Sequence, residues 1–165
     1  MNSIDDISMA EYQALAEFRY QIRRFLRFSE QAARTTGLVP QQYQLLLALK
    51  GLPNGRKATI SELAERLQIK HHSTVELIDR LAEGDLIRRS RDDQDQRRVI
   101  IHLTPHGEQL LKKLSLLHRN ELQSTGPILV HTLRALIATN SDTSEVCTRW
   151  YLSTSKTLRG TAMIQ

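Results

Sequence analysis

The stretch TISELAERLQIKHHSTVELIDRLAEGDLIRRSRDDQDQRRVIIHLT, residues 59–104, decides the fold. Its first half contains two runs with apolar residues at helical spacing, TISELAERLQI and STVELIDRLAEG, joined by residues 70–72. In the first run, Thr59 and Glu62 form the capping-box pattern that marks the start of a helix. Two short amphipathic helices with such a short connection are typical of a helix-turn-helix.

The periodicity of the sequence then changes from about 3.6 residues to about 2. LIRRSR (86–91) and RRVIIHLT (97–104) are alternating or β-branched, and the polar RDDQDQ between them is rich in turn formers, so we expect a hairpin. A helix pair followed by a hairpin is the layout of a winged helix, in which the second helix enters the major groove of DNA. We predict a mainly α fold with a small β-hairpin wing, and a winged helix-turn-helix over residues 40–104.

Two helices are predicted before this part of the chain. Ser8 and Glu11 form a second capping-box pattern, which would open a helix running to about residue 33. Residues 35–37 then break the helix, and Pro40 stands where a first helical residue is favoured. The apolar run that follows predicts a helix that ends near Leu52.

Further helices are predicted after the hairpin. Thr104 and Pro105 would open a helix that runs to about residue 122. Gly126 and Pro127 are expected to stop or kink it before another helix that ends near residue 139. The capping pattern of Asp142 and Glu145 predicts one more short segment before a polar tail.

The outer helices have apolar stripes without a partner inside the chain. Pairing these stripes between two copies would bury both, so we predict a homodimer with dimerisation helices in residues 8–36 and 105–157. The whole chain, 1–165, would then be one unit of a two-fold assembly that places two recognition helices about 34–36 Å apart on DNA.

Bulk properties agree with a DNA-binding protein but do not prove one. The formal charge of +5 and the isoelectric point near 9.7 favour an anionic partner. The one cysteine, Cys147, fits a reducing compartment, and the start of the chain lacks the features of a signal peptide. No apolar run approaches the roughly 20 residues of a membrane span, so we expect a cytoplasmic protein without a membrane partner.

Polar side chains suited to reading bases gather on the second helix of the pair. The major groove displays a full set of donors and acceptors, so short polar or forked side chains are expected to face it. The candidates for base contacts are His71, His72, Ser73, Thr74, Glu76 and Arg80. The candidates for phosphate contacts, which set register without reading sequence, are Arg56, Lys57, Lys70 and Ser73.

The predicted hairpin carries more arginine than a surface hairpin needs. Its basic residues are Arg88, Arg89, Arg91, Arg97 and Arg98, against the acidic Asp92, Asp93 and Asp95. A guanidinium sheds water more readily than an ammonium and is attracted to the negative potential of a narrow minor groove. An arginine-rich hairpin directly after a helix-turn-helix therefore favours double-stranded DNA as the partner.

Residues 59–107 resemble the MarR family, named for the multiple-antibiotic-resistance regulators, and a looser resemblance extends over about residues 12–139. The segment DQRRVIIHLT fits the family's D-x-R-x-x-x-x-x-L-T wing signature. The matching residues are Asp95, Arg97, Leu103 and Thr104, followed by Gly107 at the signature's glycine. Where the family usually has a glycine before the wing, this chain has Asp85, which tolerates a left-handed backbone.

The resemblance implies roles for individual residues. Arg97 would enter the minor groove, with Arg98 as its substitute, and Asp95 would orient the wing through a salt bridge or a backbone bond. Arg80 lies in a D-R-L motif and is open to two interpretations, a scaffold salt bridge or a phosphate contact.

The resemblance also implies a regulatory mode. Relatives are commonly dimeric repressors that bind pseudo-palindromic operators and are released by small phenolic or lipophilic ligands. Arg19, Arg23, Tyr43 and Trp150 are the candidates that could contribute to such a ligand cleft, whose true lining the sequence leaves unknown.

Three other classes of function have weaker support. A redox regulator would need Cys147 to be reactive, yet only Arg149 is a nearby cation in the sequence. A metal regulator would need ligands such as His102 and His106 to converge, and no motif requires that. No phosphate-binding loop or nucleophile motif indicates an enzyme, and we expect no cofactor or metal.

Overall fold

The structure is a computed structural model that describes residues 7–137. It divides into two compact units, one formed by residues 27–120 and the other by residues on either side of them, of which 7–26 and 121–137 are described. The segment that Asp142 and Glu145 would cap, together with Cys147 and Trp150, lies outside the described residues.

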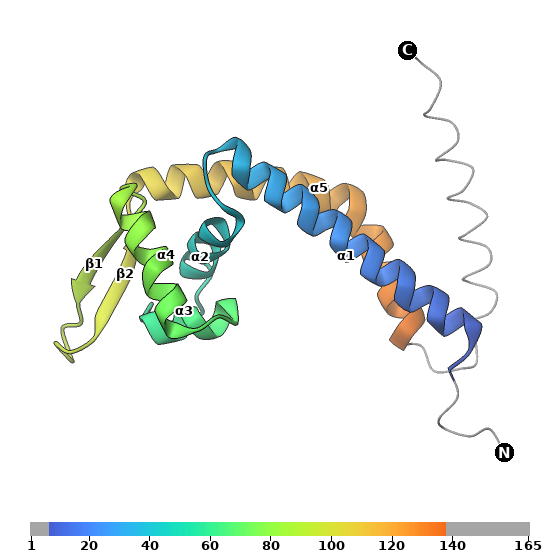
Figure 1. Ribbon diagram of the computed structural model, residues 1–165, viewed down its shortest axis with the longest axis horizontal. Coiled ribbons are helices and arrows are strands. Elements are labelled where there is room, and N and C mark those ends of the chain that lie inside the picture. Colours follow the sequence, from blue (N-terminus) through green and yellow to red (C-terminus); the bar gives the residue numbers. More distant parts are fainter. Residues whose placement is uncertain (1–6, 138–165) are drawn as a thin grey trace, which may run out of the picture. The chain divides into compact units, whose positions relative to one another are not determined.

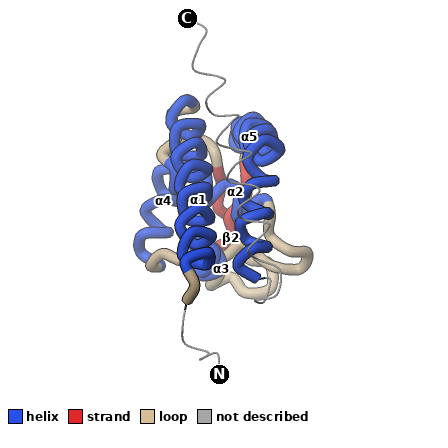
Figure 2. The backbone as a smooth tube through the Cα atoms, turned by 90° about the vertical axis from the view of Figure 1, so that its right-hand side faces the viewer, coloured by secondary structure: helices blue, strands red, loops and turns tan. Residues whose placement is uncertain are grey.

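The order of elements within residues 7–137 confirms the predicted fold class, mostly helical with one antiparallel hairpin (Figure 1). The helices are α1 (Met9–Thr35), α2 (Pro40–Lys50), α3 (Ile60–Leu67), α4 (His71–Glu83) and α5 (Pro105–Ile137), and the strands are β1 (Ile87–Arg91) and β2 (Val99–Leu103). Figure 2 shows that strands make up a small part of the described chain.

The capping patterns hold the helix starts in different ways. At α1 the box is complete, because the Glu11 carboxylate accepts from the Ser8 backbone N–H at 2.8 Å and Ser8 Oγ accepts from the Glu11 N–H at 3.3 Å. The hydrogen bonds from Ser8 lower the pKa of the Glu11 carboxyl. At α3 only half of the box forms: Thr59 accepts from the Glu62 N–H at 3.2 Å, while the Glu62 carboxylate pairs with two arginines instead.

Two predicted helix boundaries were wrong. The helix α4 begins at His71 rather than after residue 72, so the turn after α3 comprises only residues 68–70 and uses Gln68 in a left-handed conformation, φ +53°. The helix α5 continues through Pro127 to Ile137. Proline removes one N–H, and the carbonyl that this N–H would have bonded belongs to the exposed Gln123, where water can replace it.

The core lies in the unit of residues 27–120. Leucine and isoleucine side chains from α2, α3, α4, β2 and α5 meet there without solvent exposure; among them are Leu45, Leu46, Leu63, Ile78, Leu81, Ile101 and Leu114. The hairpin joins this core through β2, since the Ile101 N–H donates to the Ala58 carbonyl at 2.9 Å just before α3. The wing is thus attached to the segment before α3 by a backbone hydrogen bond as well as to the core by side-chain packing.

A close backbone joint connects the hairpin to the start of α5. Asp85 has the left-handed backbone expected of it, φ +53°, two residues before β1. Thr104 Oγ1 donates to the Asp85 carbonyl at 2.7 Å and accepts from the Gly107 N–H at 3.0 Å. A Cβ atom at Gly107 would lie 2.0 Å from the Leu86 carbonyl oxygen, so only glycine fits at this point of the wing signature.

None of the helices within residues 7–137 has the length and apolar character required to cross a bilayer.

Candidate nucleic-acid interface

One side of α4 is buried and the other is polar and exposed. Leu77, Ile78 and Leu81 point into the core. His72, Glu76 and Arg80, spaced four residues apart, share the exposed side, and His71 lies exposed in the first turn. Ser73 is half-buried. The exposed side carries donors, acceptors and a forked cation, which is the mixture needed to read the edges of base pairs.

Thr74 does not belong to this exposed side, contrary to its place among the predicted base contacts. Its side chain is fully buried, and its hydroxyl donates to the Lys70 carbonyl at 3.2 Å. Position 74 lies three, four and seven residues before Leu77, Ile78 and Leu81, so it falls on the same helix face as they do. Thr74 has a polarity suited to DNA, but its place on the buried face directs its side chain into the core.

Replacing Thr74 by valine should leave DNA recognition intact. Valine has nearly the same shape, and the Lys70 carbonyl still accepts from the backbone N–H of residue 74 at 3.1 Å. We expect an affinity within about twofold of the parent and a stability change of about 1 kcal/mol or less. The matched variant His72→Ala alters the exposed side and should change affinity or base preference in the same binding titration. Equal effects of both variants would contradict this assignment.

Lys70 stands at the N-terminus of α4 in an extended conformation and is exposed. Its side chain forms no cap bond, and no ion pair is found for it among residues 7–137. The first backbone N–H groups of a helix, together with its dipole, favour an anion at this end. Lys70 is therefore suitably placed for a phosphate group, as predicted from its position before the helix.

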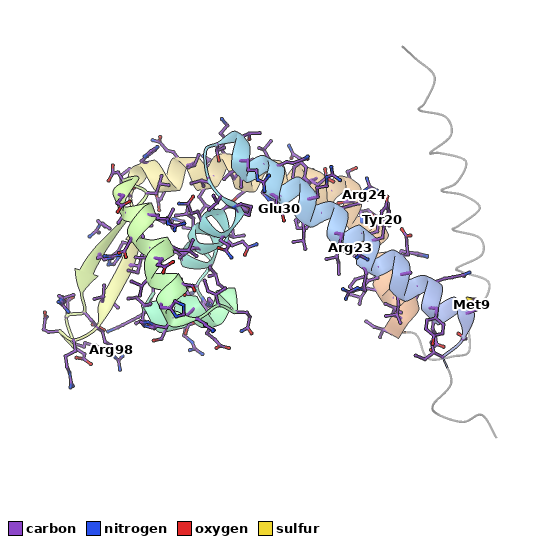
Figure 3. The ribbon with its side chains drawn as sticks, in the orientation of Figure 1. Met9, Tyr20, Arg23, Arg24, Glu30 and Arg98 are labelled. Atoms are coloured by element: carbon purple, nitrogen blue, oxygen red, sulfur yellow. The ribbon has the colours of Figure 1, made fainter. Side chains whose placement is uncertain are left out.

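The tip of the wing is organised around Asp95. One carboxylate oxygen accepts from the Arg97 N–H at 3.1 Å and contacts Arg97 Nε at 3.4 Å; the other contacts Arg98 Nε at 3.3 Å. The Asp95 carbonyl accepts from the Arg98 N–H at 2.8 Å. The Arg97 side chain is 94% exposed, and Arg98, at the tip in Figure 3, is 61% exposed. The backbone of the tip is held while its arginines project outward.

The other wing arginines are more engaged with the protein. Arg89 pairs with Asp79 of α4, so the salt bridge suggested for the D-R-L motif is formed by its aspartate. No ion pair is found for Arg80 itself among the described residues. Arg91 donates to the Gln96 carbonyl at 3.2 Å. Arg88 is exposed and faces His102 across the hairpin.

His102 lies on β2 and contacts Ser90 Oγ through Nε2 at 2.8 Å. Burial, together with the positive charge of Arg88, lowers the pKa of the His102 imidazole. Within residues 7–137 no three His, Cys, Asp or Glu side chains are close enough to hold a metal ion. Among the described residues, His102 therefore links β2 to β1 through its contact with Ser90.

An ion pair that sequence reasoning missed joins the wing to the segment before α3. Asp92, directly after β1, has a side chain only 4% exposed, and the Lys57 ammonium lies 2.8 and 2.9 Å from its two carboxylate oxygens. The Gln94 N–H also donates to this carboxylate, at 3.0 Å. Lys57 had been predicted to contact phosphate. Because 35 residues separate the partners, no local pattern could have paired them.

Acid should weaken the wing through Asp92. The hydrogen bond from Lys57, followed by that from the Gln94 N–H, lowers the pKa of the Asp92 carboxyl. A lowered folded pKa gives a stabilisation that is complete above the unfolded value of about 3.9 and disappears as the pH falls through the folded value. The wild type should therefore lose more melting temperature than Asp92→Asn between neutral pH and about pH 3. Parallel losses in a thermal melt series would contradict this.

The helices α3 and α4 form a helix-turn-helix whose second helix has an exposed polar side. The hairpin of β1 and β2 follows with arginines at its tip, so this part of the chain is a winged helix-turn-helix. Residues 36–98 match the family model described as the MarR family. This match covers less than half of the chain, and it agrees with the resemblance of the wing signature to the same family.

Named relatives agree with this resemblance. A transcriptional regulatory protein ascribed to the hcr operon of Thauera aromatica is 31% identical over 96 residues, which cover 58% of this chain and 56% of that protein. The matched segment therefore spans little more than half the length of this curated relative. The curated relatives are named as transcriptional regulators rather than enzymes.

Solved structures share the fold at low sequence identity. A Staphylococcus aureus MepR variant bound to an oligodeoxyribonucleotide is 21% identical, with a TM-score of 0.58 over 94% of this chain and 99% of that one. Bordetella bronchiseptica BpsR, whose DNA binding is regulated by 6-hydroxynicotinic acid, is 20% identical, with a TM-score of 0.53 over 84% of this chain and 89% of that one. At these identities the likeness establishes the fold alone.

Proposed function

We propose that the protein is a sequence-specific DNA-binding transcriptional regulator. One observation carries this proposal: the unit of residues 27–120 contains both features that a DNA duplex would require. The exposed side of α4 is polar, and Arg97, whose side chain is 94% exposed, projects from the wing tip. A helix fits the major groove, and an arginine finds its strongest attraction in a narrow minor groove.

Each group would have a distinct task on the duplex. His72, Glu76 and Arg80 would contact base edges, where a good bidentate pair discriminates by about 1–3 kcal/mol. Lys70 and the first turn of α4 would contact phosphates and fix the register. Arg97 would enter the minor groove from a tip whose backbone Asp95 already orders, so the backbone of the tip loses little conformational entropy on binding.

A homodimer is the proposed binding form. The described segments 7–26 and 121–137 expose many large apolar side chains; they include Met9, Tyr12, Leu15, Tyr20, Leu122, Val130, Leu133 and Ile137. A second copy would remove this surface from water. Leu111 and Leu114 belong to the core of the unit 27–120, so the proposed dimerisation segment of α5 follows residue 120.

The proposed role is that of a repressor released by a small aromatic or lipophilic ligand. Regulation of BpsR by 6-hydroxynicotinic acid, an aromatic acid, supports this class of ligand. Such a ligand would act through different affinities for the DNA-binding and the released arrangement of the dimer. Because its target is chromosomal DNA, we propose the cytoplasm as the site of action.

Binding titrations at several salt concentrations test the function. A labelled duplex chosen by the protein should bind as one dimer per site, as measured by fluorescence anisotropy together with sedimentation. The logarithm of the binding constant should fall linearly with the logarithm of salt concentration, with a slope that reflects on the order of 6–10 displaced counterions. Failure to bind any duplex in dilute salt would overturn the proposal.

A further inference from the structure

The Lys57 ammonium has no hydrogen-bonding capacity left for DNA. An ammonium carries three N–H groups. Lys57 directs them to both carboxylate oxygens of Asp92, at 2.8 and 2.9 Å, and to Oε1 of Gln94, at 2.9 Å. Its charge is also balanced by a carboxylate that is only 4% exposed. A residue that contacts phosphate would keep donors and charge available to solvent, as Lys70 does.

Asp92 in turn closes the base of the wing loop. Its backbone N–H donates to the Arg98 carbonyl at 3.0 Å, and its carbonyl accepts from Gln96 Nε2 at 3.2 Å. Its carboxylate accepts from the Gln94 N–H at 3.0 Å. These bonds close the loop over residues 92–98, which also includes Asp95. Lys57 therefore holds the base of the loop whose far end presents Arg97.

We propose that Lys57 is a positioning residue for the wing: its ion pair with Asp92 fixes the tip, and it acts on DNA through Arg97. This inference rests on the proposed function. Removing Lys57 alone leaves the buried charge of Asp92 without an ion-pair partner, and the loop would rearrange to expose this carboxylate to water. Removing the charge of Asp92 likewise leaves Lys57 without its partner. The two residues should therefore have the same effect on DNA binding, although one is basic and the other acidic.

The direction in which Asp92→Asn changes DNA affinity distinguishes a positioning role of Lys57 from a direct contact of Lys57 with phosphate. If Lys57 contacted phosphate, removing the negative Asp92 would leave affinity unchanged or raise it. Positioning predicts that Asp92→Asn and Lys57→Met both weaken binding in anisotropy titrations. Their losses should lie below that of Arg97→Ala, about 5- to 150-fold. The double variant Lys57→Met/Asp92→Asn should lose no more DNA affinity than the single variant that binds DNA less tightly.

A double-mutant cycle with Arg97 supplies the second test. If Lys57 acts through Arg97, adding Lys57→Met to Arg97→Ala should lower affinity by less than about twofold. Lys70→Met is the matched control, since it removes a lysine from the exposed start of α4 and should lower affinity equally with or without Arg97. Full additivity of Lys57→Met with Arg97→Ala would overturn the inference.

Hydrogen exchange of the full-length protein without DNA keeps this inference separate from the proposed function. The backbone N–H groups of Asp92 and Arg98 should exchange about tenfold faster or more in Lys57→Met and Asp92→Asn, while amides in α2 keep their protection. If the wing has no part in DNA binding, Arg97→Ala will be silent while this loosening persists. Unchanged exchange at both amides would refute the positioning role whatever the DNA result.

Discussion

Replacing Arg97 by alanine should cost the dimer about 1–3 kcal/mol of operator affinity while leaving its melting temperature nearly unchanged. The two effects separate because the Arg97 side chain is 94% exposed and contacts only Asp95 within the described part of the chain. Little packing is lost in the free protein, whereas the proposed minor-groove contact is lost completely. Anisotropy titrations and thermal melts of the same preparation measure both quantities.

Arg97→Lys is the charge-matched control for this experiment. It keeps the positive charge, but an ammonium is more strongly hydrated and lacks the planar guanidinium. We expect an affinity between those of the wild type and Arg97→Ala. Unchanged affinity of Arg97→Ala would remove the minor-groove role of the wing tip, and full recovery by lysine would reduce that role to a simple charge contact.

Replacing Gly107 by alanine should have the largest effect on stability, on the order of 3 kcal/mol or more. The added Cβ would lie 2.0 Å from the Leu86 carbonyl oxygen and 3.0 Å from its carbon, so backbone has to move. The same Leu86 oxygen accepts from the Thr104 N–H at 3.1 Å, and relieving the clash would break this bond. Urea unfolding at a fixed protein concentration measures the loss.

Gly84→Ala, at the end of α4 before the hairpin, is the control for the stability loss of Gly107→Ala. A Cβ there would meet its nearest atoms at 3.6, 3.7 and 3.9 Å, which are ordinary contacts. We expect a stability change of less than about 1 kcal/mol, since the backbone of Gly84 lies in a region open to alanine. Equal urea midpoints for the two variants would contradict the close contact between Gly107 and the Leu86 carbonyl.

The elements themselves were predictable because each depends on local sequence. Helical spacing over residues 59–83 and alternation over residues 86–104 are strong signals of period, and the structure has the expected order of helix, helix and hairpin. The boundaries were less predictable. Pro127 has its usual helix-breaking character, yet the helix continues through it, since an exposed helix can leave one carbonyl to water.

The candidate site was predictable in composition but not in contacts. An exposed arginine at the wing tip with a neighbouring aspartate follows from the signature around Asp95 and Arg97. The direction of Thr74 follows from its helical spacing to Leu77, Ile78 and Leu81, a signal that its polar character obscured. The pairing of Lys57 with Asp92 depends on how the chain folds back over 35 residues, and no periodic pattern encodes such a contact.

The most direct test of the central claim is selection of duplex DNA by the purified full-length protein from a random pool, followed by sequencing. Reading by two copies of α4 predicts one enriched motif with two inverted half-sites about 10–10.5 base pairs apart, centre to centre. Recovery of sequences without any shared motif, or of one undivided site, would contradict recognition by a two-fold pair of winged helices.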